Sequence, residues 1–256
     1  MTDLPISLTF DIEKDCCPLL HTTFGIEVGL PKILKLLEKY KIDCTFFITG
    51  EVAELFPGIV RQIAKGHEVA SHGYRHETLN KMTTYKKGSI KQSKMVLEKT
   101  INKRVIGFRA PRFLVSRELY EALVEVGFKY DSSLTFFTPQ QILTKTIFPE
   151  FRVQLPSAIL NFPMGLQVFK AICRANSFPV IFFHSWEAVD VRALLNTADL
   201  DLPSVKKYLR PDMWVNTGEV FLKRLEILIE YLLDSGLRFI TLRDALQTQN
   251  TARAPM

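Results

Sequence analysis

Short apolar segments alternate with longer amphipathic segments along almost the whole chain. The apolar segments are rich in β-branched and aromatic residues, which is typical of buried strands. They comprise residues 6–10, 44–49, 67–71, 105–108, 128–130, 180–183 and 237–240. The amphipathic segments, which repeat apolar positions at helical spacing, comprise residues 31–40, 51–65, 82–101, 117–126, 217–235 and 242–246. This alternation predicts a series of strand–helix units.

The predicted helices carry recognisable signals at their ends. Pro31 suits a first helical turn, Ser116 suits an N-cap, and Gly127 suits the residue that ends a helix. Two segments are less regular: residues 135–178, which prolines interrupt, and the polar connection 187–216. Strands that alternate with helices favour a parallel sheet. About seven such units suit an α/β fold with a closed or nearly closed barrel.

The composition is that of one globular domain. The chain has 256 residues, of which 47% are hydrophobic and 23% are charged, so it can bury a sizeable core. No composition break marks a linker, and we expect a single domain over residues 1–256. The net charge of +6 would suit a polyanion or an anionic membrane surface, but the basic residues are spread along the chain. Because no basic and aromatic motif accompanies them, nucleic acid is not an expected partner, whereas peripheral membrane contact stays open.

Targeting and redox signals favour the cytoplasm. No segment reaches the ~18 apolar residues of a membrane span, and residues 1–5 lack the basic region and apolar stretch of a secretory signal. Four cysteines without CxxC spacing fit the reduced thiols of a cytoplasmic protein. They are Cys16, Cys17, Cys44 and Cys173. The alternative is that Cys16 or Cys17 binds a metal beside Asp15.

Ionisable side chains gather just after the C-terminal ends of five predicted strands. They are Asp11, Glu13 and Asp15; His72 and His76; Arg109; Asp131; and His184 with Glu187. In a parallel barrel all these ends lie on one face, where the active sites of such folds form. Taken singly, an Asp after a strand is usually a turn or helix cap, and we expect structural roles for His21 and His67. Five such strand ends together predict an active site.

The pair His72 and His76 suggests a metal. Two imidazoles and one carboxylate are the ligands of a catalytic zinc that keeps one position open for water. The spacing alone is a weak signal, because residues four apart are neighbours on any helix. Its position directly after a predicted strand strengthens the interpretation.

Five short motifs occur in the order in which they occur in a known family. They are Thr9-Phe10-Asp11, Ser71-His72-Gly73-Tyr74-Arg75-His76, Arg109-Ala110-Pro111, Asp131-Ser132-Ser133 and Phe182-Phe183-His184. On these motifs the chain resembles the polysaccharide deacetylase family, the NodB homology domain of carbohydrate esterase family 4. The resemblance covers residues 5–247 and looks closest to the signal-less branch associated with exopolysaccharide synthesis. It implies a distorted (β/α) barrel and metal-dependent hydrolysis of the N-acetyl group of amino sugars.

The chain departs from the family pattern at two positions. The family usually has adjacent aspartates in the first motif, but here Ile12 follows Asp11. Residues 11 and 13 point to one face of an extended strand, so we expect Glu13 to be the metal ligand, with Asp15 as the alternative. Gly73 stands where many members carry Ser or Thr, which removes a hydroxyl but no ligand.

The resemblance also implies a role for each site residue. It assigns the metal, zinc by preference, to His72 and His76, and Glu13 is our choice for the third ligand. It assigns the base to Asp11, the acid to His184 and the orientation of Asp11 to Arg109. It also assigns a raised pKa of His184 to Asp131 and the oxyanion donor to the backbone N–H of Arg112, and we expect Trp186 to contact the substrate. The expected partner is an N-acetylated sugar or glycan. Two alternatives stay open, an amidase acting on a small cyclic or linear amide and a non-catalytic glycan-binding relative. The identity and length of the sugar, and any lipid linkage, also stay open.

Overall fold

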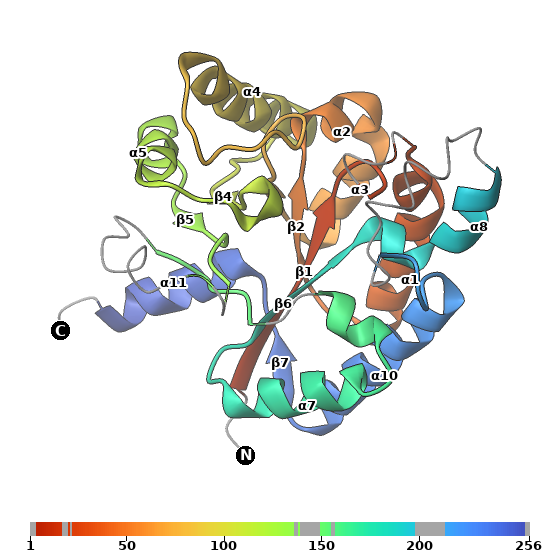
Figure 1. The fold of residues 1–256 in the computed structure, drawn as a ribbon. Helices are drawn as coiled ribbons and strands as arrows, with labels where there is room; N and C mark the ends of the chain where they lie inside the picture. Colours follow the sequence, from red (N-terminus) through yellow and green to blue (C-terminus); the bar gives the residue numbers. More distant parts are fainter. Residues whose placement is uncertain are drawn as a thin grey trace.

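The computed structural model describes residues 4–16, 20, 22–135, 138, 149–154, 157–197 and 213–253. Within them, seven parallel strands form one sheet, and helices are arranged around its outside (Figure 1). The strands are β1 (Leu4–Ile12), β2 (Thr45–Ile48), β3 (Glu68–Ser71), β4 (Gly107–Phe108), β5 (Tyr130–Asp131), β6 (Val180–His184) and β7 (Leu237–Phe239). All seven correspond to the predicted apolar segments.

The strand order is β5-β4-β3-β2-β1-β6, and β7 also pairs with β1. Strand β1 is nine residues long, and its two halves have different neighbours. Residues 4–6 pair with β7, whereas residues 7–11 pair with β6. Because β1 forks in this way, the sheet curls into a half-barrel, and the prediction of a distorted barrel with about seven strands is confirmed.

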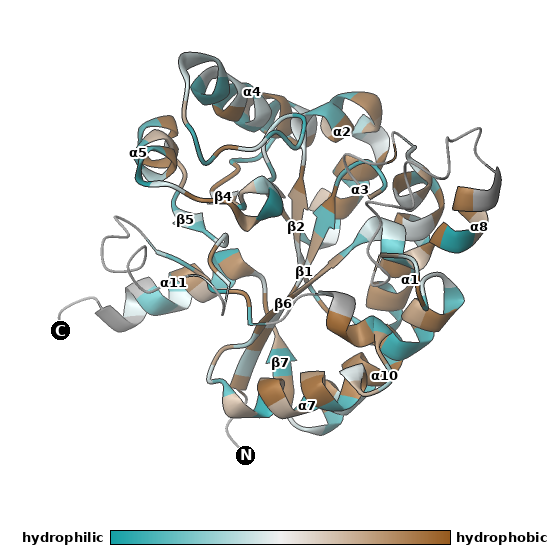
Figure 2. Cartoon of the chain, viewed as in Figure 1, coloured by the Kyte–Doolittle hydropathy of each residue, from teal (hydrophilic) through white to brown (hydrophobic). Residues whose placement is uncertain are grey.

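The helices follow the strands as the alternation predicts. They are α1 (Leu30–Tyr40), α2 (Gly50–Leu55), α3 (Pro57–Gly66), α4 (Thr84–Ile101), α5 (Arg117–Val126), α7 (Gly165–Ala175), α8 (Val191–Thr197), α10 (Glu219–Asp234) and α11 (Leu242–Arg253). Hydrophobic residues concentrate on the central strands and on α7 (Figure 2). A run of aromatic rings fills this core: Phe46 stacks on Phe10 at 5.2 Å, and Phe169 of α7 stacks on Phe183 of β6 at 5.7 Å between ring centroids.

Two predicted elements are corrected. The helix predicted over residues 51–65 is two helices, α2 and α3, which meet at Phe56. Pro57 explains the break, since a proline lacks the N–H of a helix interior and restricts the residue before it. The segment 135–178, predicted to be irregular, contains α7, whose Phe169 and Cys173 are buried. Packing of these apolar residues stabilises a helix that the surrounding prolines obscure in the sequence.

Three of the four cysteines lie within the described residues. Cys16, Cys44 and Cys173 are buried thiols, and burial raises the pKa of Cys173 to about 12. Cys17 and His21 lie outside the described residues. Among the helices that the structure describes, none has the length and apolar character needed to cross a bilayer.

Candidate active site

Glu13, His72 and His76 converge just past the ends of β1 and β3. Each offers one ligand atom, and the three atoms lie within 4.8 Å of one another. Glu13 Oε2 is 2.6 Å from His76 Nε2 and 3.6 Å from His72 Nε2. All three side chains are buried. This is the arrangement expected of three protein ligands around one divalent metal.

The two histidines come together through a loop and not through a helix. His72 follows β3 directly, and the chain then turns at Gly73, with φ +75°, and at His76, with φ 56°. The Gly73 carbonyl accepts hydrogen bonds from Gly50 N at 3.0 Å and Ser93 Oγ at 2.7 Å. The left-handed conformation favours glycine at position 73. Glycine at position 73 lacks the hydroxyl of the Ser or Thr that many family members carry, but it permits the tight turn that directs both imidazoles toward Glu13.

The hydrogen bonds made by these three side chains also fit a metal site. His72 Nδ1 lies 2.9 Å from the carbonyl oxygen of Arg109, so Nδ1–H donates to it and Nε2 faces Glu13. Metal-binding imidazoles are oriented in this way by a carbonyl or carboxylate. Burial raises the pKa of Glu13, but hydrogen bonds from His72 and His76 outweigh it and hold the pKa below its usual value. The carboxylate thus stays ionised, as a ligand must be.

Asp15, the alternative ligand, is used elsewhere. Its carboxylate accepts hydrogen bonds from Thr22 Oγ1 at 2.8 Å, Phe24 N at 2.7 Å and Gly25 N at 2.8 Å. A Cβ at Gly25 would stand 2.6 Å from Asp15 Oδ1, so only glycine permits this approach. Asp15 therefore caps the turn after β1, and the geometry favours Glu13. Cys16 does not belong to the ligand group found among the described residues.

Arg109 lies fully buried beside Asp11. Its Nη1 donates to Asp11 Oδ1 at 2.7 Å and to Thr9 Oγ1 at 3.0 Å. Its Nε and Nη2 donate to the carbonyl and hydroxyl oxygens of Ser132 at 3.0 and 2.9 Å, and the guanidinium stacks over Phe47 at 4.0 Å. The second oxygen of Asp11 lies 4.0 Å from His72 Nε2. One carboxylate oxygen is thus held by Arg109 while the other faces the metal-ligand group.

His184 ends β6 next to Glu13. Its Nε2 lies 4.0 Å from Glu13 Oε1, and its side chain is 19% exposed. Burial lowers the pKa of His184, and the charges of Glu13 and Asp11 oppose this shift. The imidazole is therefore close to the ligand group and still reachable from solvent.

Trp186 is buried, which corrects the expectation that its ring contacts the substrate. Its ring stacks on His184 with centroids 4.7 Å apart and is only 4% exposed. The ring packs with Leu20, Val191 and Leu195 in a small apolar cluster. Trp186 supports His184 from behind, because the residues after β6 turn it toward the interior.

Asp131 does not contact His184, which corrects the predicted pairing. The carboxylate of Asp131 accepts from Ser133 N at 3.0 Å and Ser133 Oγ at 2.7 Å, and the charges that act on His184 are those of Glu13, Asp11, His72 and His76. The strand order explains this, since β5 and β6 are the two ends of the ordered path. Asp131 meets Glu150 of the neighbouring segment instead.

The turn after Arg109 has an unusual backbone. Arg112 and Phe113 both adopt positive φ, at 59° and 57°, which is strained for residues other than glycine and gathers at functional sites. The Arg112 side chain is exposed. The assignment of the Arg112 N–H as oxyanion donor stays a prediction.

Several supporting residues were absent from the predicted site. Ser132 and Ser133 stand inside a quoted motif, and the residue pattern alone showed that they are polar but not what they bind. Glu150 lies in a segment without periodicity, so nothing in the sequence marked it.

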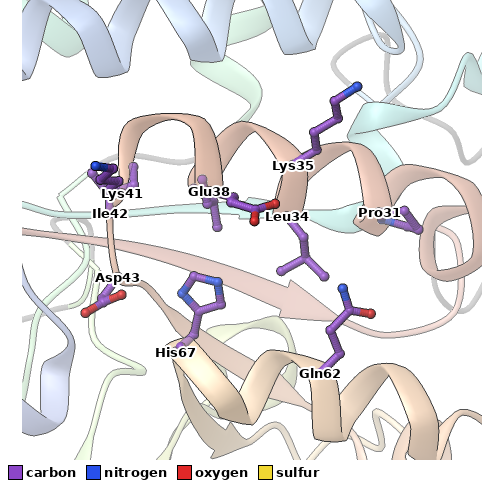
Figure 3. Close-up of a pocket in the computed structure, with 11 residues that line it drawn as sticks. Pro31, Leu34, Lys35, Glu38, Lys41, Ile42, Asp43, Gln62 and His67 are labelled. Carbon is purple, nitrogen blue, oxygen red and sulfur yellow. The ribbon is translucent and has the colours of Figure 1, made fainter.

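His67 lies at the opposite ends of the strands, where it lines a pocket of about 490 Å³ between α1 and α3 (Figure 3).

The chain is similar in sequence to several known proteins. The family model for polysaccharide deacetylases matches residues 2–130. A peptidoglycan deacetylase of Helicobacter pylori is 37% identical over 123 residues, covering 46% of this chain and 42% of that protein. A peptidoglycan-N-acetylglucosamine deacetylase of Bacillus cereus is 30% identical over 206 residues, covering 78% and 63%. The chain thus spans less than two thirds of the length of these relatives.

A solved allantoinase structure shares the fold. It is 16% identical, covers 98% of this chain and 92% of its own, and superposes with a TM-score of 0.71. At this identity the likeness concerns the arrangement of strands and helices alone.

Proposed function

The chain belongs to the polysaccharide deacetylase family, and we propose that it is a metal-dependent hydrolase that removes the N-acetyl group from an amino sugar in a glycan or glycan precursor. One observation carries the proposal. Asp11 lies 4.0 Å from His72 and His184 lies 4.0 Å from Glu13, so both stand beside the buried group of Glu13, His72 and His76. A proton acceptor and a proton donor beside a metal site are what amide hydrolysis requires.

Glu13, His72 and His76 would hold the metal, with zinc preferred for a set of two imidazoles and one carboxylate. When bound, such an ion supplies Lewis-acid chemistry, since it polarises the acetyl carbonyl and makes a water molecule more acidic. The single buried carboxylate and two histidines disfavour calcium and magnesium, which prefer more oxygen ligands.

The protein's own residues move the protons. Asp11, held by Arg109 through one oxygen, accepts the proton of the attacking water with the other. His184 donates a proton to the departing amine nitrogen, and its partial exposure allows it to be reprotonated from solvent. The backbone N–H of Arg112 donates to the oxyanion that develops on the former carbonyl oxygen.

Acetate release tests the function. We expect the purified protein to release acetate from a panel of N-acetylated glycans and sugar nucleotides, and zinc added after chelation to restore the rate. Asp11→Asn is the matched variant, because it should keep the metal and lose turnover. If a small cyclic or linear amide is hydrolysed while all N-acetyl sugars stay intact, the protein is an amidase. A protein that binds glycans without releasing acetate is a non-catalytic relative.

A further inference from the structure

Asp131 and Glu150 form a carboxyl pair behind the candidate site. Their backbones are joined, since Asp131 N donates to Pro149 O at 3.0 Å and Phe151 N donates to Asp131 O at 2.8 Å. Asp131 is buried, Glu150 is partly buried, and their side chains hydrogen-bond to each other. Two carboxylates cannot hydrogen-bond without a proton between them, so one of the pair is protonated.

The surroundings assign that proton to Glu150. Burial and the charge of Asp131 raise the pKa of Glu150 well above its usual value. Asp131 also has a raised pKa because of burial, but it receives hydrogen bonds from Glu150 and Ser133 and lies within the field of Arg109. Tyr120 of α5 faces the pair too, with its hydroxyl 3.3 Å from Glu150 Oε2. Neutral Glu150 therefore donates to ionised Asp131.

A chain of hydrogen bonds leads from this pair to the site. Ser133 Oγ donates its hydrogen to Asp131 Oδ1 at 2.7 Å, so its lone pair accepts from Ala110 N at 2.7 Å. Ala110 follows Arg109, whose carbonyl orients His72 and whose guanidinium holds Asp11. The backbone at residues 109 and 110 is thus fixed from the side of Ser133.

We propose that Glu150 is a positioning residue: by donating to Asp131 it keeps Ser133 bonded to Ala110, and so holds the backbone that orients His72 and Asp11. The inference rests on the proposed function for its kinetic consequence, but its structural part is independent of turnover. An ionised Glu150 would repel Asp131, and a residue without a donor would remove the support that the Asp131 carboxylate receives from the side opposite Ser133.

Two substitutions separate this role from simple packing. In the wild type, Leu134 N donates to Glu150 Oε1 at 2.8 Å. Glu150→Gln retains both an acceptor for Leu134 N and a donor toward Asp131. Glu150→Ala retains neither. At saturating metal we expect Glu150→Ala to lower kcat by about 10–100-fold, the scale of a small misplacement of catalytic groups, with KM little changed. Glu150→Gln should stay within about 3-fold of the wild type, and Glu121→Ala on the exposed face of α5 is the control. Equal rates for Glu150→Ala and the wild type, or equal losses in Glu150→Gln and Glu150→Ala, would overturn the proposal.

Amide hydrogen exchange tests the same link without activity. We expect the Ala110 amide to lose protection in Glu150→Ala and in Ser133→Ala, but not in Glu150→Gln or Glu121→Ala. The Arg109 amide, bonded to Ser71 O at 2.9 Å in the sheet, should stay protected. Unchanged protection of Ala110, or an equal loss at Arg109, would overturn the proposal. If the wild type releases no acetate, the proposed function fails while this exchange experiment still decides the role of Glu150.

Discussion

Replacing Arg109 tests whether the buried ion pair with Asp11 organises the site. Arg109→Met keeps an unbranched apolar side chain over Phe47 but removes every donor of the guanidinium. The structure gives that group four hydrogen bonds, one of them to the Asp11 carboxylate at 2.7 Å. Because Asp11 is itself only 1% exposed, the substitution leaves a carboxylate without its partner and out of contact with bulk water.

The expected cost follows from that unpaired charge. Removing one partner of a buried ion pair costs about 3–5 kcal/mol, and the hydrogen bonds that the charged guanidinium donates to Thr9 and Ser132 contribute about 1.5 kcal/mol or more each. We therefore expect Arg109→Met to lower the free energy of unfolding by at least about 3 kcal/mol. Because the usual stability of a domain is about 5–15 kcal/mol, the variant remains folded only if the wild type lies in the upper part of that range.

Urea denaturation at neutral pH measures the effect. The m-value should be unchanged, so that the shift in midpoint reports stability. Asp11→Asn combined with Arg109→Met should recover part of the loss, because no uncompensated charge remains. Arg117→Met is the control: Arg117 forms an exposed pair with Glu121, and its loss should cost under about 0.5 kcal/mol. A cost below about 1 kcal/mol for Arg109→Met, or no recovery in the double variant, would refute the reasoning.

Three further outcomes follow from the site. Elemental analysis of the purified protein should find about one divalent metal, lost for the most part in His72→Ala and in His76→Ala; full occupancy in the double variant would exclude this site. Glu13→Gln should weaken metal binding by about 10-fold or more. Asp15→Asn should keep the metal but lower the free energy of unfolding by about 1–2 kcal/mol, because its capping hydrogen bonds become weaker. The reverse pattern would make Asp15 the ligand. The raised pKa of Glu150 makes its stabilisation complete below the ordinary glutamate value of 4.5 and progressively lost as pH rises above it. Relative to Glu150→Gln, wild-type stability in urea should therefore fall by up to about 1.4 kcal/mol per pH unit, and a constant difference between about pH 5 and 7 would contradict this.

The sequence by itself determined the fold class and the face that carries the site. Apolar segments alternating with amphipathic ones specify strand–helix units, and parallel strands necessarily end on the same side of the sheet. Side chains directly after those strands, such as Asp11, His72 and His184, therefore lie on the same face whatever the details of the loops. The break between α2 and α3 was also readable in principle, because Pro57 acts through its own backbone.

Only the tertiary structure decided which neighbours meet. Glu13 faces the histidines while Asp15 does not, because backbone N–H groups of residues 24 and 25 capture Asp15. Asp131 was expected near His184, but the strand order separates β5 from β6 and brings Glu150 beside Asp131. Trp186 is buried behind His184 for a similar reason, since the path of the chain after β6 points it inward. Such contacts join residues far apart in sequence, and their partners are set by strand order and loop path, which local residue patterns do not encode.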